Sequence, residues 1–225
     1  MEESGVLARP ITSRSVVQIH PLLLIMTGSR KLKAIELADS SYFNIVRSAV
    51  ECPSKEATGY LFGVLSPKHF IIHNAYPVIT AERKNSEVSY GNESAIKRLH
   101  NLDRVIRESD SSAPYLVGGY HTHPAPDDGG LSELDDEFVK DEMSKLDMSK
   151  WIEILVLIGN KKFKNRREEG ESLTSREGRL NVSIRDAPRH GYSMTLSAHL
   201  FDVEEGPFKS SSRIALIRTS GRNSK

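Results

Sequence analysis

Two histidines and an aspartate lie close together in the middle of the chain, in the segment Y-H-T-H-P-A-P-D-D-G-G-L-S-E-L-D at residues 120–135. The apolar run from Pro114 to Tyr120 leads into this segment and predicts a buried strand. His121 and His123 would then lie two residues apart on one face of the strand, where two imidazole nitrogens can bind one ion. Further ligands of that ion must then lie near the end of this strand, and this requirement constrains the fold.

A helix is predicted from about Ser132 to Asp147, because apolar side chains recur there at helical spacing and charged side chains occupy the other positions. If Ser132 is the N-cap, Asp135 is the third helical residue, and the positive end of the helix dipole favours its ionised carboxylate. A strand end and a helix start thus converge on one cation. Two imidazoles, one carboxylate and a fourth position left for water are typical of a catalytic zinc.

Each half of this pattern also has a simpler interpretation. Ser-x-x-Asp before an apolar run is an ordinary capping box, and a His-x-His pair alone is a weak indication of metal binding. The two together, joined by an eight-residue loop with proline and glycine, favour a metal centre. Taken alone, Glu56 would be interpreted as a solvated residue at the edge of a strand.

Five residues in this order resemble the signature of the JAMM (MPN+) metalloproteases, written E…H-[ST]-H-P…S-x-x-D: Glu56, His121, His123, Ser132 and Asp135. The resemblance implies that His121, His123 and Asp135 bind Zn²⁺, one ion per chain. It implies that Glu56 takes a proton from the metal's water ligand and returns it to the leaving amine. Ser132 would donate a hydrogen bond to the tetrahedral oxyanion.

The mixed order of strands and helices predicts an α/β domain with a curved, mixed sheet and helices on both sides. The resemblance implies the same arrangement, the three-layer, cytidine-deaminase-like fold of JAMM/MPN domains. We expect this domain over residues 31–218, between a flexible N-terminal extension at 1–30 and a frayed C-terminal tail at 219–225. Met26 is an alternative start to Met1.

The individual elements follow from hydrophobic periodicity and turn residues. Helices are expected at Asp39–Glu51, Glu93–Ser109 and Ser132–Asp147. Strands are expected at Lys31–Leu37, Tyr60–Leu65, His69–Ile79, Pro114–Tyr120, Trp151–Ile158, Leu180–Arg185, Met194–Val203 and Arg213–Arg218. Two polar stretches, Thr80–Asn92 and Lys161–Arg179, are expected to be loops that touch a substrate.

Composition excludes several classes of protein. A net charge of +1, from 31 basic and 30 acidic residues, argues against nucleic acid as the main partner. The apolar segment Pro21–Met26 is too short to span a membrane. A single cysteine, Cys52, excludes an internal disulfide framework and any cysteine-cluster zinc site. We expect a cytoplasmic protein.

The leading functional hypothesis is a zinc-dependent isopeptidase that hydrolyses the amide bond between ubiquitin or a ubiquitin-like small modifier and its target. The alternative is a non-catalytic MPN-type scaffold or binding module in a larger complex, against which the intact signature argues. A TIM-barrel hydrolase would need eight strand-helix units, and a zinc deaminase would need a pair of cysteines. Modifier conjugates are the expected substrates, and a partner complex or homodimer remains open.

Overall fold

The structure is a computed structural model that describes residues 34–65, 69–78, 82–83, 88–89, 93–110, 112–124, 130–163, 170–187, 189–203 and 212–219. The predicted extension at 1–30 lies outside the described residues, as do residues 220–225 of the predicted tail. Thr219, the first residue of that tail, belongs to the last strand.

Strands make up most of the described residues, with three helices among them. The helices are α1 (Asp39–Glu51), α2 (Glu93–Ser109) and α3 (Glu133–Lys145). The strands are β1 (Ala34–Ala38), β2 (Thr58–Leu65), β3 (His69–Pro77), β4 (Glu82–Arg83), β5 (Val88–Ser89), β6 (Tyr115–Pro124), β7 (Lys150–Lys162), β8 (Gly170–Arg176), β9 (Arg179–Ala187), β10 (His190–Asp202) and β11 (Ser212–Thr219). The bounds predicted for α1 and α2 are confirmed, and the other predicted elements recur with shifted ends.

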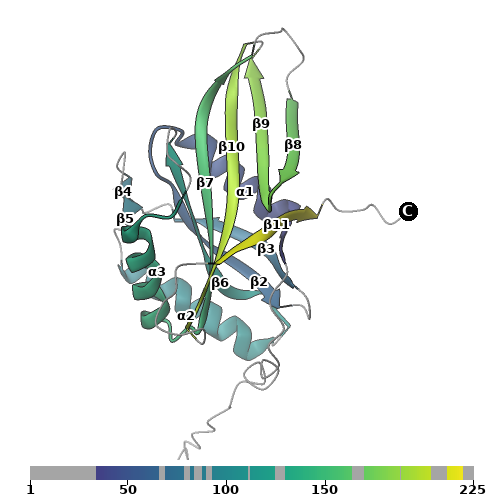
Figure 1. Cartoon of the computed structure of the whole chain (residues 1–225). Helices are drawn as coiled ribbons and strands as arrows, with labels where there is room; N and C mark the ends of the chain where they lie inside the picture. Colours follow the sequence, from purple (N-terminus) through teal and green to yellow (C-terminus); the bar gives the residue numbers. More distant parts are fainter. Residues whose placement is uncertain are drawn as a thin grey trace, which may run out of the picture. The chain divides into compact units, whose positions relative to one another are not determined.

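The main sheet closes on itself (Figure 1). Its strands follow the order β11-β1-β3-β2-β6-β7-β10-β9-β8, and β11 pairs with β10 as well as with β1. β1 and β11 run parallel, with Ala34 opposite Ala215, whereas β10 and β11 run antiparallel, with Ala198 opposite Ile214. These two pairings close a seven-stranded β-barrel, and β9 and β8 extend the sheet beyond it.

The predicted fold class, an α/β curved sheet flanked by helices in the three-layer JAMM/MPN arrangement, is therefore wrong. Closure through β1 and β11 turns one face of the sheet inward, so the side chains of the other strands cover that face together with α1, in place of a full helical layer. The prediction failed because periodicity identifies strands but does not indicate which distant strands pair.

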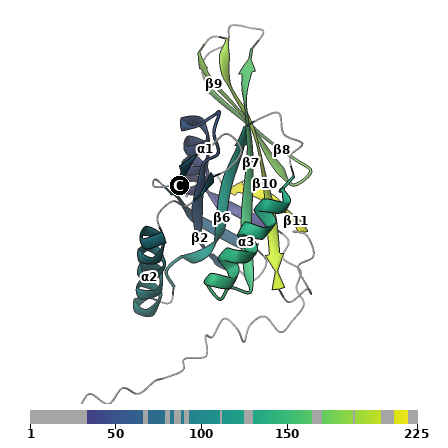
Figure 2. The ribbon, with the colours of Figure 1, turned by 90° about the vertical axis from the view of Figure 1, so that its left-hand side faces the viewer.

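Side chains alternate between the two faces of each strand, so the buried hydrophobic side chains form two separate clusters. The larger contains Ile152, Ile154 and Val156 of β7 together with residues of β1, β3 and β10, and α1 packs against it through Tyr42 and Ile45. The smaller cluster lies on the opposite face, where Val139 and Met143 of α3 pack with Trp151 of β7 and Phe201 of β10. Figure 2 shows α3 in front of β6, β7 and β10. α3 is thus held against the outer wall of the barrel.

Two predicted loops contain strands. β7 continues to Lys162 and β8 covers Gly170–Arg176, so the prediction of a loop at Lys161–Arg179 is wrong in these parts. Every residue of β8 is exposed, so no buried face marks this strand in the sequence. Within the predicted loop Thr80–Asn92, β4 and β5 form a short antiparallel pair.

None of the helices in the described part of the chain is long and apolar enough to cross a membrane.

Candidate metal centre

The strand that carries the two histidines lies between β2 and β7. β6 pairs antiparallel with β2, where Thr58 is opposite His121, and parallel with β7, where His121 is opposite Leu155. His121 and His123 are buried, with 6% and 7% of their surfaces exposed. The predicted strand and its one-faced histidine pair are therefore present on the wall of the barrel that α3 covers.

The third candidate ligand comes from the first turn of α3. Ser132 is the N-cap, and its side chain accepts a hydrogen bond from the backbone N–H of Asp135 at 3.2 Å. The Oδ2 atom of Asp135 accepts the backbone N–H of Ser132 at 2.7 Å, which completes a capping box. The capping interpretation of this motif is thus correct, and it places the Asp135 carboxylate at the start of the helix facing β6.

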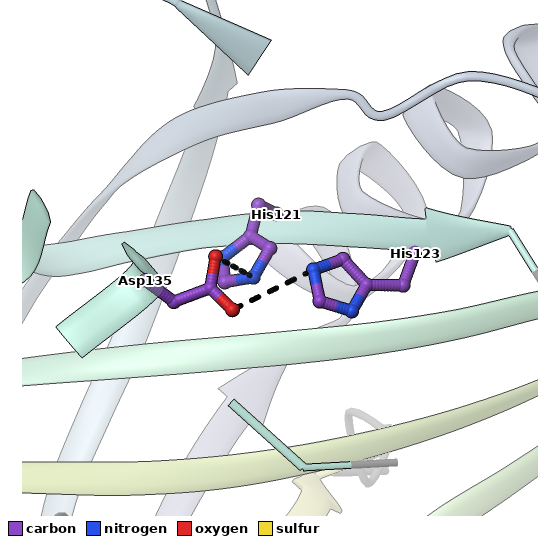
Figure 3. A group of neighbouring side chains, drawn as sticks. All are labelled: His121, His123 and Asp135. Carbon is purple, nitrogen blue, oxygen red and sulfur yellow. Dashed lines mark ion pairs between the residues drawn. The ribbon is translucent and has the colours of Figure 1, made fainter. Parts of the chain in front are cut away.

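The three side chains point toward a common centre (Figure 3). Asp135 Oδ1 lies 3.4 Å from Nε2 of His121, and Asp135 Oδ2 lies 3.7 Å from Nε2 of His123. One ligand atom from each of the three residues lies within 4.8 Å of the others. Among the described residues, this is the group of histidine, cysteine or acidic side chains whose geometry could hold a metal ion.

The carboxylates perturb the protonation of the histidines. Burial alone would lower the pKa of His121, but the neighbouring carboxylates of Asp135 and Glu153 outweigh it and raise that pKa to about 10. The pKa of His123 is also raised, because Asp135 and Glu56 outweigh its burial and the charge of His121. Burial would raise the pKa of Asp135, but the two imidazoles hold it well below its usual range. The site therefore favours positive charge at its centre.

Glu56 lies at the edge of the same centre, although the sequence around it indicated a surface residue. Its side chain is buried, and its Oε1 is 3.9 Å from Nε2 of His123. Thr122 lies between the two histidines in the sequence and hydrogen-bonds to Ala57, the residue after Glu56. Its Oγ1 accepts the N–H of Ala57 at 2.8 Å. The N–H of Thr122 donates in turn to the carbonyl oxygen of Ala57, also at 2.8 Å. This pair of hydrogen bonds fixes the segment that carries Glu56 against β6.

Glu153 of β7 is a further residue of the centre, and the sequence analysis missed it. Its Oε1 lies 2.7 Å from Nδ1 of His121, and its Oε2 accepts the indole N–H of Trp151 at 2.7 Å. With 2% of its surface exposed, Glu153 is as buried as the core around it. An acidic residue inside the otherwise apolar run from Trp151 to Ile158 is the signal that could have identified it.

The donor set fits a divalent metal ion. Nε2 of His121 is buried and has no hydrogen-bond partner among the described residues, whereas Nδ1 of the same ring contacts Oε1 of Glu153. A buried ring nitrogen that faces a carboxylate and a second imidazole is the arrangement expected of a metal ligand. Two imidazoles and one carboxylate match the protein ligands of catalytic zinc sites. The residues predicted as ligands are therefore together, with Glu56 and Ser132 beside them.

Comparisons with known proteins add a fold but no function. No family model matches this chain, and no curated protein matches it either. Among solved structures, the solution structure of protein DSY2949 from Desulfitobacterium hafniense is similar, with a TM-score of 0.50 and 12% sequence identity over 84% of this chain and 95% of that one. At this identity the likeness concerns the fold alone.

Proposed function

We propose that this chain is a zinc-dependent isopeptidase that hydrolyses the amide bond between ubiquitin or a ubiquitin-like small modifier and its target. The observation that carries the proposal is the 3.9 Å approach of the Glu56 carboxylate to His123, because it sets a candidate proton acceptor beside three candidate metal ligands. The substrate class rests on the resemblance of the signature residues to JAMM metalloproteases. The fold does not contribute to it.

His121, His123 and Asp135 would hold a zinc ion, which would supply polarisation of the substrate carbonyl and would lower the pKa of the attacking water from 15.7 to about 7. Glu56 would accept the proton of that water as its oxygen bonds to the carbonyl carbon. When the C–N bond breaks, Glu56 would give the proton to the leaving amine nitrogen. The Ala57–Thr122 hydrogen bonds fix the backbone next to Glu56, so the same carboxylate would be at hand for both steps.

Ser132 would stabilise the negative charge that develops on the carbonyl oxygen. Its side-chain oxygen accepts the N–H of Asp135, so the hydroxyl proton is available for a second hydrogen bond. The residue is exposed, as an oxyanion donor must be to meet a substrate. The same hydroxyl would therefore cap α3 and contact the reacting carbonyl.

The proposal includes a cytoplasmic location, because a chain with a single cysteine needs no oxidising compartment for its stability.

The direct test is incubation of the full chain with a panel of modifier conjugates, both Lys-linked and linear, in the presence and absence of a zinc chelator. We expect cleavage of at least one conjugate, its loss with chelator, and its return when zinc is added back. Zinc bound at one per chain with no cleavage of any conjugate would contradict the proposal and favour the non-catalytic binding module.

A further inference from the structure

Glu153 carries a buried carboxylate in the middle of β7, and two donors fix it. Nδ1 of His121 contacts Oε1 and the indole N–H of Trp151 contacts Oε2, each at 2.7 Å. A carboxylate in an apolar wall is destabilising unless it is paired and hydrogen-bonded. Because each oxygen has its own partner, the carboxylate plane cannot turn without breaking a contact.

The backbone register brings this carboxylate to His121. β6 and β7 pair in parallel with Gly119 opposite Glu153, two residues before His121 on the same face of β6. A Cβ atom at Gly119 would lie 3.0 Å from Oε2 of Glu153 and 3.1 Å from the ring of Trp151. The glycine therefore leaves the space in which the carboxylate and the indole meet.

We infer that Glu153 is a positioning residue of the metal centre, which holds the proton of His121 on Nδ1 and so directs Nε2 to the metal. This inference rests on the metal binding of the proposed function and is independent of its substrate. In known metal sites, a histidine ligand commonly donates its second ring N–H to a carboxylate, which fixes the tautomer and orientation of the ring. Trp151 contributes indirectly, because its indole N–H holds the Glu153 carboxylate, which in turn orients His121.

The two donors make glutamine a poor substitute for Glu153. A carboxamide has one oxygen acceptor, whereas His121 and Trp151 each require one at a different position. In Glu153→Gln one N–H is therefore left facing an NH₂ group. Either the indole loses its acceptor or the imidazole loses its orientation.

The first measurement is the apparent zinc affinity of the purified full chain, by competition with a chromogenic chelator. We expect Glu153→Gln to weaken affinity by roughly 10- to 100-fold. Glu142→Gln is the matched control, because Glu142 is also buried, at 4% exposure, but contacts Tyr60 and Lys145 and no candidate ligand. Equal affinity in wild type and Glu153→Gln would overturn the inference, as would an equal loss in the two variants.

Gly119→Ala provides a second route if Glu153→Gln does not fold. The added methyl group would lie 3.0 Å from Oε2 of Glu153 and 3.1 Å from the ring of Trp151, so it forces this pair of side chains to shift without removing the charge. We expect weaker zinc binding in the same direction as for Glu153→Gln. Unchanged affinity in a folded Gly119→Ala chain would contradict the positioning role.

The second measurement determines which ring nitrogen of His121 carries the proton and which one binds the metal. It uses nitrogen NMR of the zinc-loaded chain with isotope-labelled histidine. In the wild type we expect His121 to bear a slowly exchanging proton on Nδ1 and to bind metal through Nε2. Coordination through Nδ1, or failure of the wild type to bind zinc, would overturn the inference. A zinc-loaded chain with this tautomer that cleaves no conjugate would support the inference and overturn the isopeptidase proposal alone.

Discussion

Glu56 and His123 approach each other to 3.9 Å, between Oε1 of the glutamate and Nε2 of the histidine, although they come from different parts of the barrel. Glu56 precedes β2, and His123 is near the end of β6. The antiparallel pairing of these strands and the hydrogen bonds between Ala57 and Thr122 bring the two side chains together. Glu56 is not among the three side chains whose ligand atoms lie within 4.8 Å of one another, so its carboxylate can contact a water at the metal site without being one of the three candidate ligands.

Glu56→Gln should therefore retain zinc and fold but lose hydrolysis, because glutamine can hold a water but cannot accept its proton. We expect kcat to fall by roughly 10²- to 10⁴-fold. Turnover of a conjugate is measured together with zinc content and melting temperature. Wild-type turnover in a zinc-loaded variant would remove Glu56 from the mechanism.

The purified chain should contain about one zinc ion, and substitution of any one ligand by alanine should remove it. A site with three protein ligands loses most of its affinity with one of them. Elemental analysis of His121→Ala, His123→Ala and Asp135→Ala tests this expectation, with Glu142→Gln as the control for loss of a buried polar group. Stoichiometric zinc in all three alanine variants would place the metal elsewhere.

Zinc binding should release protons and strengthen as pH rises. The pKa of His121 is raised to about 10 in the metal-free chain, so the ring is protonated at neutral pH and must lose a proton to bind metal. Below that pKa, the apparent affinity should rise about tenfold per pH unit for each proton displaced. Titration calorimetry in buffers of different ionisation enthalpy counts the protons. Heats that do not depend on the buffer would contradict the prediction.

Substitution of Ser132 separates helix capping from catalysis. Ser132→Ala should lower kcat by roughly 10²- to 10³-fold and reduce the free energy of unfolding by about 0.5 to 2 kcal/mol. Ser132→Gly is the matched variant, since glycine caps nearly as well as serine but has no hydroxyl. It should be nearly as stable as wild type and nearly as inactive as the alanine variant. If both zinc-loaded variants hydrolyse conjugate at the wild-type rate, Ser132 is a cap alone.

Gly118→Ala should destabilise the barrel where β6 meets β7. A Cβ atom at Gly118 would lie 1.8 Å from the carbonyl oxygen of Ile152, so the two strands must separate to admit it. We expect a loss of about 1 to 3 kcal/mol in the free energy of unfolding, measured by chemical denaturation. Gly170→Ala is the control, because no atom of the described residues lies within 4 Å of a Cβ atom there. Equal stability of the two variants would show that the β6–β7 pairing tolerates the methyl group.

The sequence predicts the local half of the candidate site well. His121, His123 and Asp135 lie within one strand-loop-helix unit, so alternation and capping rules are sufficient to bring them together. Glu56 is identified by the family signature alone, because nothing in its own surroundings distinguishes it from a surface residue. Glu153 has a local signal, a charge in an apolar run, but its meaning depends on which strand lies beside β7.

The closed barrel is the part of the fold that local patterns do not contain. It depends on the pairing of β1 with β11, two short strands whose hydrophobic alternation would equally fit the edges of an open sheet. β8 is not evident from the sequence for a different reason. All its side chains are exposed, and its extended conformation depends on pairing with β9. Both failures concern partners that are specified by tertiary contacts.

Barrel closure also sets the order in which the chain can fold. β1 finds its β11 neighbour only after residues 215–219 have been synthesised, whereas β6, α3 and β7 follow one another along the chain and can pack earlier. A growing chain can therefore assemble the candidate metal ligands on a sheet that is still open, in which β1 and residues 198–200 each have an unpaired edge where β11 will later bind. The arrival of β11 covers both edges at once and removes the surface on which two nascent chains could pair.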